Sequence, residues 1–164
     1  MLETIGILLL ITLANAAPVL ASVVFSIHGT RAIDGGLKLK DGQYLLGQTK
    51  TWRGLVSSLV ITAIIASVLL PAPLSSALLS GIIVSAFAMS GDLLTSFIKR
   101  RLKLPSSTRV IFLDQIPESL APALVVSFIY PLNLIQIITI VSSFIMIEMI
   151  LSSVYDHFKK IRHS

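Results

Sequence analysis

The stretch SGDLLTSFIKRR, residues 90–101, ends a long apolar segment with three consecutive cations and carries one carboxylate inside that segment. A carboxylate is costly in hydrocarbon, so an acid within a membrane segment usually marks a functional site. In a helix, Asp92, Ser96 and Lys99 share one face. With Lys99 at the interface, Asp92 would lie about 10 Å inside. We therefore expect this stripe to face a bundle interior, as a site or as a packing face with a charge anchor.

The overall composition is typical of an integral membrane protein. Of 164 residues, 54% are hydrophobic and only 13% are charged, with a mean hydropathy of +0.90, whereas soluble domains carry roughly 25% charged residues. The chain has no cysteine, which excludes disulfides, thiolate nucleophiles and zinc–thiolate sites. Its three histidines are scattered, and it contains neither a Walker A sequence nor GxGxxG. A nucleotide would therefore be held in another way.

We predict an all-α integral membrane fold with five transmembrane helices, forming one catalytic domain over residues 1–164. Two polar loops, 28–53 and 99–111, and the C-terminal tail hold all thirteen Lys and Arg residues. The positive-inside rule assigns these segments to the cytoplasm and the N-terminus to the outside. A four-helix alternative would place the basic tail outside. The expected spans are 5–27, 54–70, 74–98, 112–130 and 132–155.

Two carboxylates and many cations suit a site for the phosphate chain of a nucleotide with a divalent metal. Magnesium usually takes one or two carboxylates plus substrate phosphates, and phosphoryl-type transfer needs positioning and charge neutralisation more than side-chain nucleophiles. The two carboxylates are Asp92 and Asp114. Residues 50–54 lead directly into the second expected helix, where side-chain cations and the helix N-terminus suit a phosphate. The alternative is a positive loop that only sets topology.

Two further polar residues lie inside expected spans. Asn15 could line a cavity or form a hydrogen bond to another helix. Glu148 could line the cavity, form a hydrogen bond across helices or pair with a cation. The sequence leaves both roles open.

The chain resembles the CDP-diacylglycerol synthase family, and within it the archaeal branch, the CDP-archaeol synthases. Ser90, followed after eight residues by Lys99-Arg100, resembles the start of the wider family's signature. The Pro-Gly-His-Gly-Gly block of that signature is absent and its closing Asp-Arg-x-Asp is shortened to Asp114-Gln115, as in the archaeal branch. The other matching positions are Asn15 to Pro18, Asp34, Asp41-Gly42, Leu46-Gly47, Lys50-Thr51-Trp52-Arg53-Gly54, Gly91-Asp92, Ser96-Phe97 and Arg101.

The resemblance implies transfer of CMP from CTP to 2,3-di-O-geranylgeranylglycerol phosphate, an isoprenoid ether-lipid phosphate, with release of pyrophosphate. It implies that Asp92 and Asp114 hold Mg²⁺ and act with Lys99 as the catalytic residues. The contacts to the cytosine base cannot be inferred from motif spacing. The CTP- and phosphate-binding residues that the resemblance implies are Lys50, Thr51, Arg53, Gly54, Ser96, Arg100, Arg101 and Gln115.

We expect a multi-pass protein of the cell membrane whose active site faces the cytoplasm and is open to the lipid. No nucleic-acid partner is expected, and the sequence does not indicate an oligomeric state. Three other functions fit the residues less well. One is a CTP-dependent lipid kinase, which would transfer the γ-phosphate. Another is a small anion transporter with Asp92 as a coupling acid, although five spans do not suit an inverted repeat. The third is a structural membrane subunit.

Overall fold

The computed structural model describes residues 2–25, 30–105, 108 and 110–162, with side chains described up to residue 154. The described chain is helical apart from loops and two isolated β-bridges between residues 32 and 51. This confirms the predicted five-helix, all-α fold. The helices are α1 (Leu2–Val24), α2 (Trp52–Leu69), α3 (Leu74–Arg101), α4 (Gln115–Val126) and α5 (Leu134–Arg162).

Four of the described helices, α1, α2, α3 and α5, are long and apolar enough to cross a membrane. The fourth helix, α4, has 12 residues, or about 18 Å at helical rise, against the roughly 30 Å of a hydrocarbon core. Turns at residues 111–114 and 127–129 flank it on both sides, so α4 is shorter than the expected range 112–130. The sidedness of the chain remains a prediction.

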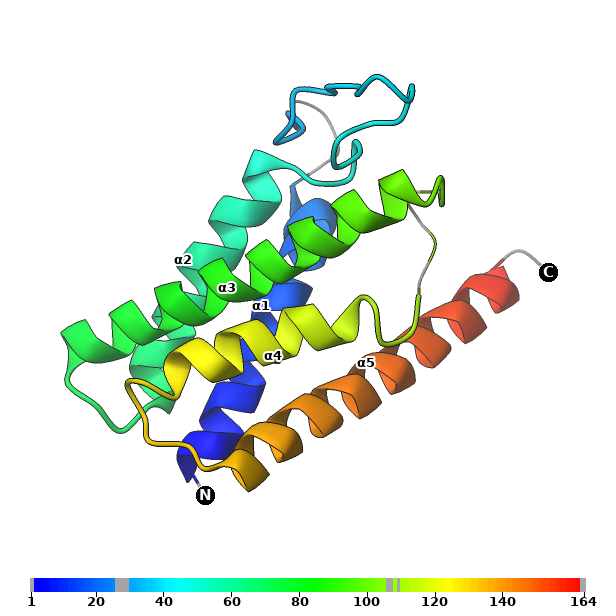
Figure 1. Cartoon of the computed structure of the whole chain (residues 1–164). Helices are drawn as coiled ribbons and strands as arrows, with labels where there is room; N and C mark the ends of the chain where they lie inside the picture. The colour runs from blue at the N-terminus through cyan, green and yellow to red at the C-terminus, as the bar shows by residue number, and fades with distance from the viewer. Residues whose placement is uncertain (1, 26–29, 106–107, 109, 163–164) are drawn as a thin grey trace.

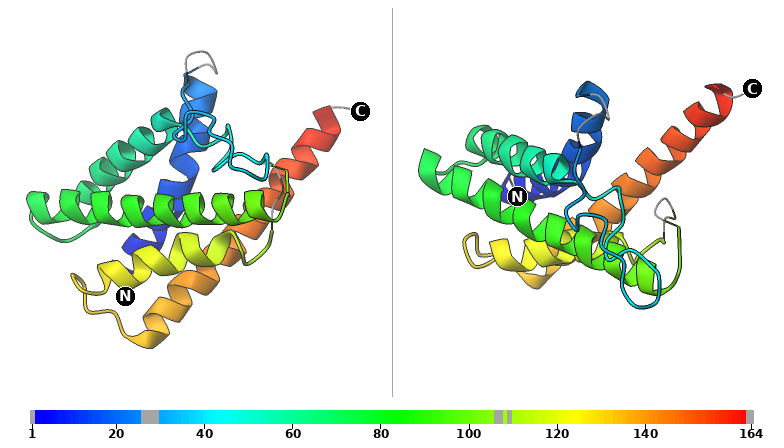
Figure 2. Two further views of the ribbon diagram at one scale, coloured as in Figure 1. Left: turned by 45° about the horizontal axis from the view of Figure 1, so that its top comes forward. Right: turned by 90° about the horizontal axis from the view of Figure 1, so that it is seen from above.

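The helices pack as a bundle in which α3 has a central position. It lies against α2 on one side and α4 on the other, while α5 runs along α4 and also contacts α1 (Figure 1). The N-terminus and the two short turns lie toward one end of the bundle. The α1–α2 loop and the C-terminal ends of α3 and α5 lie toward the other, as the second set of views also shows (Figure 2). The basic segments therefore gather at one end of the fold.

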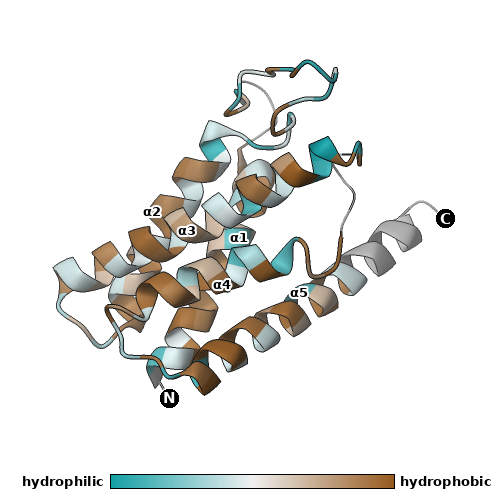
Figure 3. Ribbon diagram, in the orientation of Figure 1, coloured by the Kyte–Doolittle hydropathy of each residue, from teal (hydrophilic) through white to brown (hydrophobic). Residues whose placement is uncertain are grey.

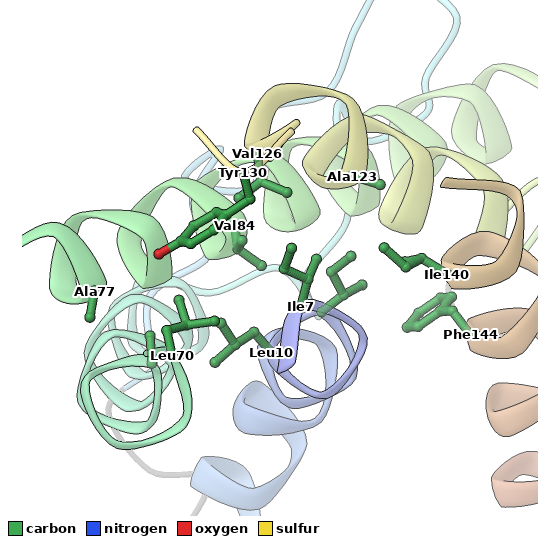
Figure 4. Packing of buried hydrophobic residues seen from close by; sticks show 12 residues of the cluster. Ile7, Leu10, Leu70, Ala77, Val84, Ala123, Val126, Tyr130, Ile140 and Phe144 are labelled. Carbon is green, nitrogen blue, oxygen red and sulfur yellow. The ribbon is translucent and has the colours of Figure 1, made fainter. Parts of the chain in front are cut away.

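Polarity follows the same division. The hydrophilic residues concentrate at the loop end, whereas the helices below it are mostly apolar (Figure 3). There the helices meet in a core cluster that draws on α1, α3, α4 and α5 and on the end of α2 (Figure 4). The largest fully buried side chains of this cluster are Ile7, Leu10, Ile11, Ile140 and Phe144. The apolar core therefore lies apart from the hydrophilic residues at the loop end of the bundle.

The contact between α2 and α3 depends on small and hydroxyl-bearing residues. A Cβ atom at Gly81 would lie 2.6 Å from the Ala63 Cα, so the two backbones approach too closely for any side chain there. Ser58 donates to the Ala14 carbonyl at 2.7 Å, and its Oγ lies 2.7 Å from that of Ser85. Close backbone approach and interhelical hydroxyl bonds are the usual basis of helix packing in membranes. Gly81 and Ser85 lie on the same face of α3 as Asp92 and Ser96. Both are buried, which confirms the expectation that this face is interior.

Candidate functional site

A large cavity with a volume of about 550 Å³ lies at the loop end of the bundle. All five helices and the α1–α2 loop contribute to its wall. Ligand pockets for small molecules and cofactors are typically about 300–1,000 Å³, so the volume of this cavity lies in the range for such ligands. The polar side chains that line the cavity are those of Asn15, Ser22, Thr30, Gln48, Thr49, Lys50, Thr51, Arg53, Asp92, Glu118 and Glu148.

Asp92 projects from α3 into this wall and is held there by Lys50. The ammonium nitrogen of Lys50 lies 2.6 Å from each carboxylate oxygen of Asp92. Both side chains keep about a fifth of their surface exposed, 22% for Lys50 and 21% for Asp92. The expected intramembrane acid is therefore a cavity residue, and its partner comes from a loop 42 positions earlier in the chain.

A second carboxyl group lies beside Asp92. Glu118 on α4 also lines the cavity and is within hydrogen-bonding reach of Asp92, close enough to interact electrostatically with Asp114 as well. Tight packing of α3 on α4 creates this proximity. A Cβ atom at Gly91 would collide with the carbonyl group of Pro117 and the amide nitrogen of Glu118. Gly91 therefore allows the two helices to bring their carboxyl groups together.

Asp114 immediately precedes α4 and pairs with Lys99 of α3. The Lys99 ammonium lies 2.9 Å from Asp114 Oδ1, an ion pair without the angle of a hydrogen bond. The backbone N–H of Val110 donates to Oδ2 at 3.1 Å. The Lys99 ammonium also donates to the Thr108 carbonyl at 3.3 Å. The side chains are only 10% and 15% exposed. This pair fixes the segment before α4 against the end of α3.

The start of α2 forms another part of the cavity wall. Thr51 is the N-cap of α2, and its hydroxyl accepts a hydrogen bond from the Gly54 N–H at 3.2 Å. Thr51 and Arg53 line the large cavity, and Gly54 lines a smaller adjoining one of about 60 Å³. Arg53 also donates to the Phe25 carbonyl at 2.5 Å, beyond the end of α1. A helix N-terminus with an adjacent guanidinium favours an anion here.

The α1–α2 loop is ordered by two aspartates. Asp34 accepts hydrogen bonds from the backbone N–H groups of Gly36, Leu46 and Gly47 at 2.9, 2.8 and 3.2 Å. Partial burial raises the pKa of Asp34, but these donors outweigh it, so the pKa lies below its ordinary value. The backbone N–H of Gln43 likewise lowers the pKa of Asp41, with a further contribution from Arg101. The loop is therefore stable with both carboxylates ionised.

Arg101 fastens this loop to α3. Its guanidinium donates to Asp41 Oδ2 at 2.7 Å and to the Tyr44 carbonyl at 2.6 Å, and it lies 5.2 Å from the centre of the Phe97 ring. The loop thus contacts α3 at two places, near its tip through Arg101 and at its end through Lys50. Arg101 is also one of the expected phosphate ligands, and that role stays a prediction.

The predicted site residues thus fall into two groups. Lys50, Thr51, Arg53 and Asp92 line the large cavity, and Gly54 adjoins it. The others lie outside that lining, as far as the described residues define it. Ser96, Lys99 and Arg100 are buried at the end of α3, and Gln115 accepts a hydrogen bond from the Phe112 N–H at 2.7 Å. The residues outside the lining are Ser96, Lys99, Arg100, Arg101, Asp114 and Gln115.

The sequence interpretation assigned no role to Glu118, although a pattern could have identified it. Asp114 and Glu118 are four residues apart at the start of a helix, which places them on one face. Asn15 and Glu148, whose roles the sequence left open, both line the cavity. The Asn15 amide additionally donates to the Ile11 carbonyl of its own helix at 3.0 Å.

The described residues contain no group of three or more His, Cys, Asp and Glu side chains arranged to hold a metal. They do contain the adjacent carboxyl groups of Asp92 and Glu118, and the ammonium of Lys50 already lies against both oxygens of the first. Magnesium commonly binds through one or two carboxylates and completes its shell with phosphates and water. The donor set therefore fits a magnesium ion that binds together with a nucleotide.

Comparison with known proteins gives a consistent result. A family model described as CarS-like, CDP-archaeol synthase, matches residues 1–159. The CDP-archaeol synthase of Thermococcus gammatolerans is 38% identical over 129 residues, which cover 75% of this chain and 70% of that protein. The CDP-archaeol synthase of Thermococcus onnurineus is 40% identical over 126 residues, which cover 73% and 69%.

A solved structure shares the whole fold. It is described as an intramembrane enzyme for archaeal membrane lipid biosynthesis, and it superposes with a TM-score of 0.76 at 26% sequence identity. The match covers 93% of this chain and 94% of the other. The arrangement of helices around the cavity is therefore shared with a membrane enzyme.

Proposed function

The chain belongs to the CDP-archaeol synthase family, and from this we propose that it transfers CMP from CTP to 2,3-di-O-geranylgeranylglycerol phosphate. The products are the CDP-activated, unsaturated archaeol lipid and pyrophosphate. This is a step of archaeal phospholipid biosynthesis. An oxygen of the lipid phosphate attacks the α-phosphorus of CTP, and the bond between that phosphorus and the oxygen bridging to the β-phosphate breaks.

One observation carries the proposal, namely the composition of the cavity wall. A helix N-terminus with two adjacent cations, Lys50 and Arg53, faces a cavity that also presents the carboxyl groups of Asp92 and Glu118. A triphosphate is bound by the helix N-terminus and the cations, and its divalent cation is bound by the carboxyl groups. A purely structural bundle would have no reason to bury such a combination beside apolar helices.

The protein side chains act here mainly by positioning and by neutralising charge. Arg53, held at the start of α2, and Lys50, at the end of the loop, are placed to bind the triphosphate oxygens. Both can stabilise the negative charge that develops on the departing pyrophosphate. Thr51 and Gly54 fix the helix N-terminus that these cations flank. Holding the two phosphates in line accounts for a large share of such catalysis.

We propose that Asp92 is the main carboxylate that binds Mg²⁺ and that Glu118 lies beside it. Asp114, which is near Glu118 but outside the cavity lining, adds negative charge to the site. When bound at these carboxylates, the ion would supply Lewis-acid chemistry and offset the negative charge of the triphosphate. Lys99 then acts through Asp114, whose orientation it fixes. The remaining predicted ligands, Ser96, Arg100, Arg101 and Gln115, support the cavity from behind.

We further propose that the cavity faces the cytoplasm, because every Lys and Arg residue lies within residues 28–53, 99–111 and 159–162 and such residues favour that side. CTP would enter from water at the loop end. The isoprenoid chains of the acceptor would stay in the bilayer, beside the apolar helices.

The test uses CTP labelled at either the α- or the γ-phosphate, with purified protein, Mg²⁺ and the ether-lipid phosphate. Label from the α-phosphate should appear in the lipid, with cytidine retained, and label from the γ-phosphate should appear in pyrophosphate. Transfer of the γ-label to the lipid would identify a kinase instead. An ester-linked diacyl phosphate serves as the comparison acceptor.

A further inference from the structure

Lys50 and Asp92 form an ion pair at the position where the proposed function requires a metal. The Lys50 ammonium lies 2.6 Å from both oxygens of Asp92, so it occupies the position in which a cation would bind both oxygens of this carboxylate. A divalent ion cannot join the pair without strong repulsion from the ammonium. Either Asp92 does not bind metal, or Lys50 leaves when the metal arrives.

The loop geometry allows the side chain of Lys50 to leave while its backbone stays in place. The Lys50 N–H donates to the Gly47 carbonyl at 3.3 Å, and the Lys50 carbonyl accepts from the Ile33 N–H at 2.8 Å. The next residue, Thr51, is the N-cap of α2. A lysine side chain is a flexible four-carbon stem with a compact charge at its end. Movement is therefore confined to rotation of that stem.

A triphosphate in the cavity offers the departing ammonium a new partner. Lys50 and Asp92 both line the cavity, next to Thr51 and Arg53 at the start of α2. A phosphate bound at that helix N-terminus lies within reach of a lysine anchored one residue before the N-cap. Without a nucleotide, removal of Lys50 from Asp92 would leave two mostly buried charges without their partner, which is unfavourable.

Resting on the function proposed above, we propose that Lys50 is an exchange residue. Its ammonium group binds the Asp92 carboxylate in place of the metal when no nucleotide is bound. It moves to the phosphates when the metal and CTP bind together. Lys50 thereby couples the two ligands, so that each binds weakly without the other. By thermodynamic linkage the coupling is reciprocal.

The second aspartate–lysine pair provides a matched control. Lys99 pairs with Asp114 at 2.9 Å, close to the same distance, yet neither residue lines the cavity. Asp114 also accepts from the Val110 N–H, and Lys99 also donates to the Thr108 carbonyl. Because its groups have these additional partners, this pair is expected to stay intact when ligands bind.

The experiment measures Mn²⁺ affinity of the purified full-length protein by electron paramagnetic resonance, with and without α,β-methylene CTP, which cannot be cleaved. In the unaltered protein the analogue should tighten Mn²⁺ binding at least tenfold, within the usual range of such couplings. In Lys50→Met, Mn²⁺ alone should bind about tenfold more tightly than in the unaltered protein, and the coupling should fall to about threefold or less. Lys99→Met should retain the coupling.

Two results would overturn the proposal. One is independent binding of Mn²⁺ and the analogue to the unaltered protein, which needs no variant. The other is a folded Lys50→Met protein, eluting as the unaltered one does, that keeps the full coupling. Cytidylyl transfer by the unaltered protein is measured in parallel. Transfer without coupling would refute the exchange alone, whereas absence of transfer would refute the proposed function.

Discussion

The two aspartate–lysine pairs have the same chemistry and different surroundings. Lys50–Asp92 joins a loop to a helix at the cavity wall, with about a fifth of each side chain exposed. Lys99–Asp114 lies behind the cavity, with exposures of 10% and 15% and further backbone partners on both sides. An ion pair next to an open cavity can exchange partners, while one enclosed by backbone groups mainly fixes structure.

Asp92→Asn should lower CTP turnover by about 10³-fold, because it removes the carboxylate that we assign to the metal and leaves Lys50 without its partner. Steady-state rates with labelled CTP measure this loss. Thermal unfolding in detergent serves as the control. A variant that folds normally and keeps full activity would contradict the assignment.

Asp114→Asn should lower turnover less, by about 10–100-fold, as expected for a residue that supports the ligands of a site. Its stability should suffer more than that of Asp92→Asn, because a poorly exposed Lys99 loses its partner. The cost is about 2–3 kcal/mol after allowing for partial exposure. Differential scanning fluorimetry of the two variants side by side checks the order. Equal activity losses with equal stability would remove the distinction between the pairs.

Gly91→Ala and Gly81→Ala separate packing at the site from packing elsewhere. Each added methyl group meets backbone atoms of the facing helix, so each variant should lose about 1–3 kcal/mol of stability. Only Gly91 sets the approach of α4 that places Glu118 beside Asp92. Gly91→Ala should therefore also weaken Mn²⁺ binding in the presence of the nucleotide analogue. Equal metal affinities in the two variants would show that this approach does not matter for the site.

Arg101→Ala should raise the KM for CTP about fivefold with little change in kcat. The loss of its bonds to Asp41 and Tyr44 loosens the loop that carries Lys50, at a cost of about 1 kcal/mol. Asp41→Asn should have a similar effect, and the double variant should add little to either single one. A fall in kcat alone would instead favour direct contact of Arg101 with the reacting phosphates.

Asp34 should make the loop sensitive to acid. Its pKa is lowered in the fold, so its contribution is complete above the ordinary pKa of an aspartate and is lost as the pH falls through the lower, folded value. Hydrogen exchange at Leu46 and Gly47, whose N–H groups it binds, should become unprotected over that range. Asp34→Asn should show weak protection at every pH. Protection that persists in acid would show that other contacts hold the loop.

Hydropathy and charge were sufficient to predict five helices and a single polar end, because those features depend on local composition. The first and last residues of α4 were harder to predict. The preceding Phe112 adopts a left-handed backbone conformation (φ 69°), and turns follow Val126, so the helix is shorter than its apolar segment. Asp92 and Lys50 were both expected at the site, on grounds of charge and resemblance.

The pairing of Lys50 with Asp92 could not be predicted in the same way, because it joins residues far apart in the sequence and depends on how the loop folds. The same holds for Arg101. The resemblance implied a phosphate ligand at this position, and its contacts with Asp41 and Tyr44, in a loop some sixty positions earlier, could not be predicted from it. Glu118 gains its place from the packing of Gly91 on Pro117, a contact that no local pattern specifies.

The central claim is that Asp92 carries the metal which accompanies CTP. Its most direct test is the stoichiometry of Mn²⁺ bound in the presence of α,β-methylene CTP, measured for the unaltered protein, Asp92→Asn and Asp114→Asn. We predict that Asp92→Asn loses the bound ion, while Asp114→Asn retains it at reduced affinity. Retention of the ion by Asp92→Asn, with its loss in Asp114→Asn, would contradict this assignment and show that the metal binds at the Lys99–Asp114 pair.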